Sequence, residues 1–183
     1  MPLLVEKYLT PDEIARLFSV IASPRDRAIF RLAYHRGLRA GEIGRLQLAD
    51  FRPREERLYV HRLKGSISGE YRLCDNELRA LRAWLRLRGA APGPLFLSRR
   101  GRGISQQMLD VLMKRYGALA AIPQAKRHMH ALKHSCGTHL LERGESLEDV
   151  QDHLGHANIQ NTLIYARFTN PRRQAREQRL RHW

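Results

Sequence analysis

The spacing of apolar residues along the chain predicts a mostly helical protein. From Ile14 to Ile21, apolar side chains recur at intervals of three and four residues, which is the pattern of one buried helix face. The preceding stretch Thr10-Pro11-Asp12-Glu13 has the form of a capping box with proline in the first turn. Similar runs predict further helices that begin near Ser23, Asp75, Ser105, His130, Ser146 and either Asn158 or Asn161.

Two stretches alternate between apolar and polar residues and therefore predict β-strands. They span residues 57–63 and 70–74, and the Gly/Ser-rich segment 64–69 between them is typical of a hairpin loop. The chain contains neither an internal repeat nor a low-complexity linker. We therefore expect one domain of the α+β class, mainly α with a small antiparallel β-sheet formed by a hairpin or by three strands.

Apolar runs and cysteines limit the kind of protein this can be. No run approaches the roughly 18–20 apolar residues of a membrane span, so we expect a cytoplasmic, nucleoid-associated protein without a membrane partner. Cys74 and Cys136 stand far apart, with no second cysteine at the spacing of a zinc knuckle. Both are expected to be reduced residues of the core.

The net charge is the feature of the composition that says most about the binding partner. The chain has 33 Lys and Arg against 18 Asp and Glu, a formal net charge of +15, and arginine greatly outnumbers lysine. An excess of this size indicates a polyanionic partner, most simply double-stranded DNA. The loop that holds Arg99, Arg100 and Arg102 is a natural contact for the DNA backbone.

The segment from His128 to Phe168 concentrates the candidate chemistry. On a helix, His130, Lys133 and His134 share one face, and a Leu-Gly-His turn at His156 and then Tyr165 follow. Zinc binding is disfavoured because there is no H-E-x-x-H motif and no obvious third ligand. Two interpretations stay open: each histidine is structural, or the cluster binds a phosphodiester that a tyrosine hydroxyl attacks.

A second candidate region lies much earlier in the chain. Gly37 permits a sharp turn, so Arg39 is expected at a turn-to-helix junction from which it can point into a cleft. Taken alone, Arg39 and Glu42 also fit an ordinary surface pair at i,i+3 spacing. Lys64, where the first strand ends, likewise fits either a DNA contact or a solvated hairpin lysine.

Two separated motifs resemble the tyrosine recombinase (phage integrase) family. Residues 130–168, HALKHSCGTHLLERGESLEDVQDHLGHANIQNTLIYARF, are similar to the family pattern H-x-L-R-H…A-T-H-L-L-x-x-G…L-G-H-x-x-I-x-T-T-x-x-Y. Residues 32–51, LAYHRGLRAGEIGRLQLADF, resemble the earlier box in which G-[LM]-R-x-x-E precedes L-x-x-x-D. The resemblance covers about residues 9–168 and implies the catalytic-domain architecture of that family.

The resemblance also implies a role for each matching residue. Tyr165 corresponds to the nucleophile that forms a 3′-phosphotyrosine bond, and Arg39 to the first arginine of the phosphate clamp. Lys64 corresponds to the general acid for the leaving oxygen. The remaining implied roles are phosphate contact and proton transfer for His130 and His156, and support of the site for Glu42 and His134. The implied activity is site-specific DNA recombination without a cofactor or metal.

The chain departs from the family pattern at Lys133, where the family has a second arginine. Lysine keeps the charge but loses the planar fork for bidentate contact with oxygen, so cleavage is expected to be attenuated. One alternative is a DNA-binding accessory or regulatory protein that has the fold and little turnover. Another is topoisomerase IB-like nicking and resealing.

The resemblance carries expectations for organisation and assembly as well. The chain starts almost at the first catalytic helix, as expected for an isolated catalytic domain or for a minimal member such as the fimbrial-switch invertases. We expect a catalytic domain at residues 1–170 and a basic tail at residues 171–183, which either docks a neighbouring protomer or is a solvated basic helix on DNA or in solvent. The expected assembly is a homotetramer on paired DNA sites, with a monomer as the alternative for the free protein.

Overall fold

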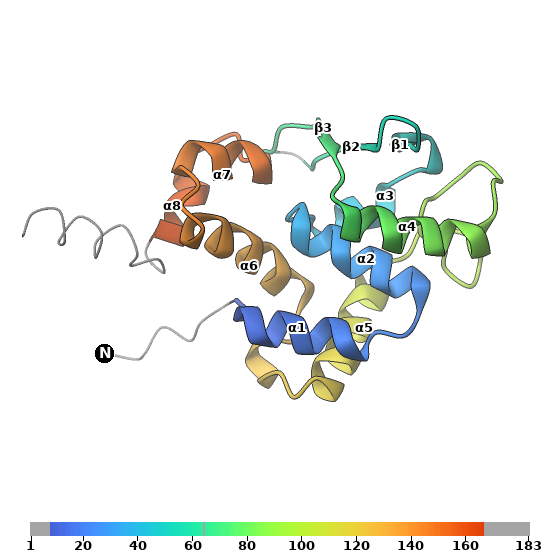
Figure 1. Ribbon diagram of the computed structural model, residues 1–183, viewed down its shortest axis with the longest axis horizontal. Coiled ribbons are helices and arrows are strands. Elements are labelled where there is room, and N and C mark those ends of the chain that lie inside the picture. Colours follow the sequence, from blue (N-terminus) through green and yellow to red (C-terminus); the bar gives the residue numbers. More distant parts are fainter. Residues whose placement is uncertain (1–7, 64, 167–183) are drawn as a thin grey trace, which may run out of the picture.

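The computed structural model of the chain describes residues 8–63 and 65–166 and shows a helical body with a small sheet at one edge (Figure 1). Helix α2 lies in the middle and packs against α3, α4 and α6, while α6, α7 and α8 pack on one another. The elements are α1 Pro11–Val20, α2 Pro24–His35, α3 Ala40–Arg45, η1 Leu48–Asp50, β1 Phe51–Arg52, β2 Arg57–Val60, β3 Gly69–Arg72, α4 Asp75–Arg88, α5 Gln106–Leu119, η2 Gln124–Lys126, α6 Met129–Glu142, α7 Leu147–Leu154 and α8 Gln160–Ala166.

The predicted helix starts are explained by local hydrogen bonds. The Thr10 hydroxyl accepts from the Glu13 backbone N–H at 3.2 Å, and the Glu13 carboxylate accepts from the Thr10 N–H at 2.8 Å. The same reciprocal arrangement joins Ser146 and Asp149 at the start of α7. Each pair satisfies backbone donors that a helix N-terminus leaves open. The capping signals in the sequence therefore gave correct starting points for α1 and α7.

The three strands form one antiparallel sheet in the order β1-β2-β3, with Leu58 opposite both Phe51 and Tyr71. Leu58 and Val60 point into the core, whereas Tyr59 between them is exposed, as the alternation of the sequence predicts. The expected fold class, mainly helical with a small antiparallel sheet, is confirmed.

Buried apolar side chains form two separate groups. The larger, which we call the main core, takes members from Leu9 in the N-terminal segment to Leu132 in α6. The smaller, which we call the minor core, lies among α6, α7 and α8 and consists of Cys136, Leu141, Val150, Leu154 and Tyr165. The candidate nucleophile is thus part of a core.

Several local expectations were wrong. Cys136 is buried, as expected, but Cys74 is exposed because it occupies the N-cap position of α4. The helical spacing of Met108 and Leu112 predicts a core position for Met108, yet it is 45% exposed because it lies on the outer face of α5 near its start. Lys64 and the basic tail fall outside the described residues. Within the described ranges, no helix combines the length and apolar character that a membrane crossing requires.

Candidate active site

Arg39 stands where the predicted turn meets α3. Gly37 in this turn has φ 56°, and a Cβ there would come within 2.2 Å of the Leu154 side chain, so the turn needs glycine for both reasons. The Arg39 Nη1 donates to the Glu42 carboxylate at 2.9 Å and to the Ser66 hydroxyl at 2.7 Å. The arginine is therefore held between its own helix and the hairpin loop, with 28% of its side chain exposed.

Glu42 is the buried anion of this region, only 1% exposed. Its carboxylate accepts from the Arg39 backbone N–H at 2.8 Å, from Arg62 Nη1 at 3.0 Å and from the Leu63 N–H at 3.3 Å. Burial by itself raises the pKa of Glu42, but the Arg39 hydrogen bonds and the charges of Arg62 and Lys133 outweigh it and lower the pKa overall. Glu42 thus stays ionised and supports its neighbouring cations.

Lys133 reaches the site from α6 and is 1% exposed. Its Nζ donates to the Leu154 carbonyl at 3.2 Å, at the end of α7. Burial, followed by the positive charges of Arg39 and Arg62, lowers the pKa of Lys133 to about 7. The position that the resemblance assigns to a permanent cation therefore holds a group that titrates near neutral pH.

His156 follows a turn that brings the end of α7 against the hairpin. Gly155 is left-handed at φ 64°, and a Cβ on it would lie 2.7 Å from the Ile67 carbonyl oxygen, so glycine is required there. The Ile67 N–H donates to the Gly155 carbonyl at 2.8 Å. The imidazole Nδ1 lies 2.9 Å from the Thr162 hydroxyl. Burial and the charge of Lys133 lower the pKa of His156 to about 3, so the ring is neutral at pH 7.

Tyr165 lies on α8 and is 1% exposed. Its ring stacks on His156 at 6.3 Å between centroids and meets His134 edge-on at 5.7 Å. The opposite wall is the backbone of Gly137, where an added Cβ would come within 2.7 to 2.9 Å of three ring atoms. Burial raises the pKa of Tyr165, and the nearby Arg39 charge only partly counters this. The phenol is therefore neutral in this state.

His130 and His134 lie next to each other on α6, as their spacing predicts, with ring centroids 4.5 Å apart. His134 is half-buried against Tyr165, whereas His130 is exposed. In the part of the chain that is described, no group of three histidine, cysteine or acidic residues is arranged to hold a metal ion.

The structure brings Arg39, Lys133 and His156 close enough for both positive charges to depress the pKa of His156. The Arg99–Arg102 loop is exposed, and its base is fixed beside α3, since a Cβ on Gly103 would meet the Gly44 carbonyl at 2.4 Å.

Sequence reasoning missed four residues that shape the site: Arg62, Ser66, Gly137 and Thr162. Within the motifs, the glycine in place of the alanine of A-T-H-L-L was a signal for Gly137, and Thr162 matches the second threonine of I-x-T-T-x-x-Y. Arg62 and Ser66 lie outside both motifs.

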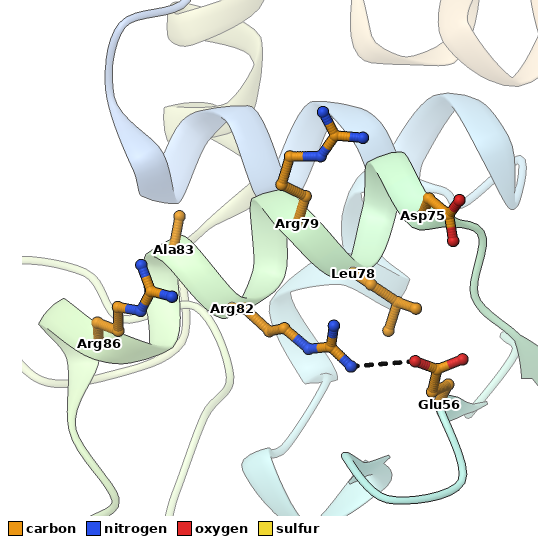
Figure 2. Close-up of a pocket in the computed structure, with 7 residues that line it drawn as sticks. All are labelled: Glu56, Asp75, Leu78, Arg79, Arg82, Ala83 and Arg86. Atoms are coloured by element: carbon orange, nitrogen blue, oxygen red, sulfur yellow. Dashed lines mark hydrogen bonds and ion pairs between the residues drawn. The ribbon is translucent and has the colours of Figure 1, made fainter.

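The basic side chains of α4 form a separate surface. A hollow of about 440 Å³ lies along this helix, and Arg82 pairs there with Glu56 at 3.0 Å. Figure 2 shows this pair together with the other lining side chains. None of the candidate site residues described above lines this hollow. Its lining residues are Glu56, Asp75, Leu78, Arg79, Arg82, Ala83 and Arg86. We assign no catalytic chemistry to this surface.

Comparison with known proteins identifies the class to which this fold and site belong. A model of the phage integrase family matches residues 7–172, and the chain belongs to that family. It is 34% identical over 166 residues to the type 1 fimbriae regulatory protein FimB of Escherichia coli (strain K12), covering 86% of this chain and 82% of FimB.

More distant relatives are longer than this chain. Tyrosine recombinase XerA of Pyrococcus horikoshii is 31% identical, with coverage of 92% of this chain and 59% of XerA. A crystal structure of XerA recombinase superimposes with a TM-score of 0.79 at 27% identity, over 96% of this chain and 63% of that one. The chain thus spans most of FimB and about three-fifths of the XerA proteins.

Proposed function

We propose that the chain is a site-specific DNA recombinase that cuts and rejoins strands through Tyr165. The observation that carries this proposal is the gathering of Arg39, Lys133 and His156 beside one tyrosine, although Arg39 precedes the other three residues by at least 94 positions in the sequence. Membership in the phage integrase family and the name tyrosine recombinase for the XerA relative support it. The net charge of +15 supports double-stranded DNA as the partner.

In the proposed reaction the Tyr165 oxygen forms a bond to phosphorus while the bond from phosphorus to the 5′-oxygen breaks. The phenol proton passes to a base, a role that the resemblance gives to His156, and the leaving oxygen takes a proton from Lys64. The anionic phosphate has to raise the pKa of His156 from about 3 for the imidazole to accept this proton. Arg39 and the protonated form of Lys133 stabilise the charge on the non-bridging oxygens, which is the main work in phosphoryl transfer. The covalent intermediate keeps the bond energy needed for rejoining.

Tyr165 also sets a structural condition for the reaction. With 1% of the residue exposed, its hydroxyl has no open path to a phosphodiester. Cleavage therefore requires α8 to move relative to α6 and α7, against which it packs. We assign the remaining expected contacts to the same proposal: His130 at the phosphate, His134 beside the nucleophile, and the Arg99–Arg102 loop on the DNA backbone.

The proposed assembly is a homotetramer on two paired DNA sites, built from a catalytic domain at residues 1–170 and a docking tail at residues 171–183. A second candidate function is that of a DNA-binding regulatory protein with little cleavage. Lys133 favours this alternative, because a cation with a pKa near 7 is a weaker phosphate clamp than an arginine.

The two functions differ in whether a covalent adduct forms. We would incubate the protein with a labelled pool of duplexes of varied sequence, each carrying a nick that lets the cleaved fragment diffuse away. Under the recombinase proposal the parent forms a denaturant-stable protein–DNA adduct and Tyr165→Phe forms none. Tyr59→Phe is the matched control, since Tyr59 is exposed on β2, and its adduct yield is expected to equal that of the parent. Salt-sensitive binding without any adduct would instead establish the regulatory function.

A further inference from the structure

Arg62 is the most heavily hydrogen-bonded side chain near the site, although no part of its side chain is exposed. Arg62 lies two residues after the end of β2, and its two terminal nitrogens donate to different partners. Nη1 donates to the Glu42 carboxylate at 3.0 Å and to the Gly37 carbonyl at 3.3 Å. Nη2 donates to the Arg36 carbonyl at 2.9 Å, to the Tyr71 hydroxyl at 3.0 Å and to the His153 carbonyl at 3.2 Å.

These contacts join three segments, each of which carries a residue of the proposed reaction. The turn between α2 and α3 leads to Arg39, and the end of α7 leads to His156. Arg62 itself lies two residues before Lys64, in the same loop. One planar guanidinium therefore relates the positions of all three segments, which a flexible ammonium cannot do.

The hairpin loop is fixed on both sides of position 64. Before it, the Arg62 N–H donates to the Ser68 hydroxyl at 3.0 Å and the Leu63 N–H to Glu42 at 3.3 Å. After it, Ser66 accepts from Arg39 and the Ile67 N–H donates to the Gly155 carbonyl. The loop is thus tied to the phosphate-clamp side and to the α7 side at once.

The environment of Arg62 indicates a geometric role. Because its side chain is wholly buried, Arg62 cannot contact DNA without leaving this network. A buried ion pair adds little net stability compared with apolar residues of the same volume, so stability alone does not explain the five hydrogen bonds. The packing is tight: Nε lies 3.1 Å from where a Cβ on Gly155 would stand.

We propose that Arg62 is a positioning residue that sets the hairpin loop so that Lys64 can protonate the 5′-leaving oxygen. This rests on the proposed function, in which Lys64 is the general acid. Arg62 then acts on one half of the reaction, the departure of the 5′-oxygen, and touches neither the phosphate nor the attacking tyrosine.

Two DNA substrates separate this role from a general loss of structure. One is the ordinary nicked duplex, and the other has sulfur in place of the bridging 5′-oxygen at the cleavage site. A thiolate leaves without a proton because its thiol has a pKa of about 8.5, so the sulfur substrate makes the general acid dispensable. Both substrates carry the DNA sequence of a duplex that forms adduct in the varied-sequence pool.

Arg62→Lys is expected to slow adduct formation on the ordinary substrate by about 10- to 100-fold, within the range of general-acid effects. On the sulfur substrate the loss is expected to stay below about threefold, since the step that needs the acid is bypassed. Arg72→Lys is the matched control, because Arg72 lies on the neighbouring strand with 75% of its side chain exposed. It should leave both rates unchanged.

A double-mutant cycle tests whether Arg62 works through Lys64. If it does, adding Arg62→Lys to Lys64→Ala causes no further loss on the ordinary substrate. Equal losses on both substrates, or a fully additive loss in the double variant, would overturn the proposal. If Arg62→Lys proves unable to fold, Tyr71→Phe provides a second test, because it removes one hydrogen-bond acceptor of the Arg62 guanidinium. Tyr71→Phe should also slow adduct formation on the ordinary substrate more than on the sulfur substrate, but by a smaller factor.

Amide hydrogen exchange separates this proposal from the recombinase proposal. If Arg62 holds the loop, Arg62→Lys speeds exchange of the Ile67 amide, whose bond to Gly155 then opens more often. Unchanged exchange would refute the positioning of the loop, even for an active enzyme. A parent protein without adduct on either substrate would refute the recombinase proposal, and faster Ile67 exchange would still show that Arg62 holds the loop.

Discussion

The two halves of the candidate site rest on different supports. Arg39 precedes α3 as its N-cap residue and Glu42 lies on that helix, whose Ile43 is part of the main core. The charges of Arg39 and Glu42 are joined in a network with Arg62. On the other side, Tyr165 is itself a member of the minor core. Lys133 there donates to a backbone carbonyl.

One half of the site is therefore preorganised, whereas the contribution of the other half depends on its conformation and its protonation. Paired charges on a large core hold Arg39 ready for an anion without reorganisation, which is what electrostatic stabilisation of a transition state requires. The half with Tyr165 and Lys133 carries a buried phenol and a lysine with a pKa near neutrality. Its contribution therefore changes with movement of α8 and with pH.

The largest effect is expected from removing the anion of the preorganised half. Glu42→Ala leaves the buried guanidinium of Arg62 without its counter-charge, and breaking a buried pair in this way costs about 3–5 kcal/mol of unfolding free energy. Urea unfolding measures this directly. Glu70→Ala is the control: it removes the partner of the more exposed Arg52 and Arg57 and should cost at most about 1 kcal/mol. Equal losses of unfolding free energy in the two variants would show that the buried Glu42–Arg62 pair contributes no more to stability than the exposed pairs of Glu70.

A smaller effect, but one with a change of sign, is expected in the minor core. Gly137→Ala places a methyl group into the Tyr165 ring, and overpacking of this kind costs about 1–3 kcal/mol. In a Tyr165→Ala background the clash is gone, so the same change should stabilise α6 by about 0.5–1 kcal/mol, the helix preference of alanine over glycine. Thermal unfolding of the four proteins completes this cycle. A destabilising Gly137→Ala in both backgrounds would mean that the glycine does not serve the tyrosine.

The smallest effect is a pH dependence of the clamp. Burial lowers the pKa of Lys133 from 10.5 to about 7, so the ammonium form is lost as pH rises through about 7. Lys133→Arg, which keeps its charge, should form adduct faster than the parent. The ratio of parent to variant rate should fall about tenfold between about pH 6 and pH 8, as the protonated fraction does. Adduct formation across this range provides the ratio, in which the titration of other groups cancels. A constant ratio would remove Lys133 from the clamp.

The sequence predicted those features of the fold that local chemistry decides. The capping boxes at Thr10 and Ser146 involve residues three positions apart, so they could be recognised without a structure. The positioning role of Arg62 could not be recognised from the sequence, because its carbonyl partners lie 25, 26 and 91 positions away. Gly137 showed a deviation from the family pattern, but only the packing of α8 reveals that the glycine makes room for a tyrosine.

The roles of Tyr165, Arg39, Lys64, His130, Lys133 and His156 stay predictions until adduct formation is measured. The family pattern assigned them by spacing, and the geometry adds conditions that spacing does not contain. One is that the nucleophile is buried, and another is that the cation beside it titrates near neutrality.

The tie between the hairpin and the end of α7 has a consequence for the order in which the protein matures. Contacts between distant parts of a sequence form late, because a long loop must close first, and a chain is made from its N-terminus. A nascent chain that ends before residue 150 contains Arg39, Glu42 and Arg62, but the carbonyls of His153 and Gly155 that fix the hairpin have not yet been made. The proposed site, Tyr165 included, is thus assembled only after α7 and α8 have been synthesised.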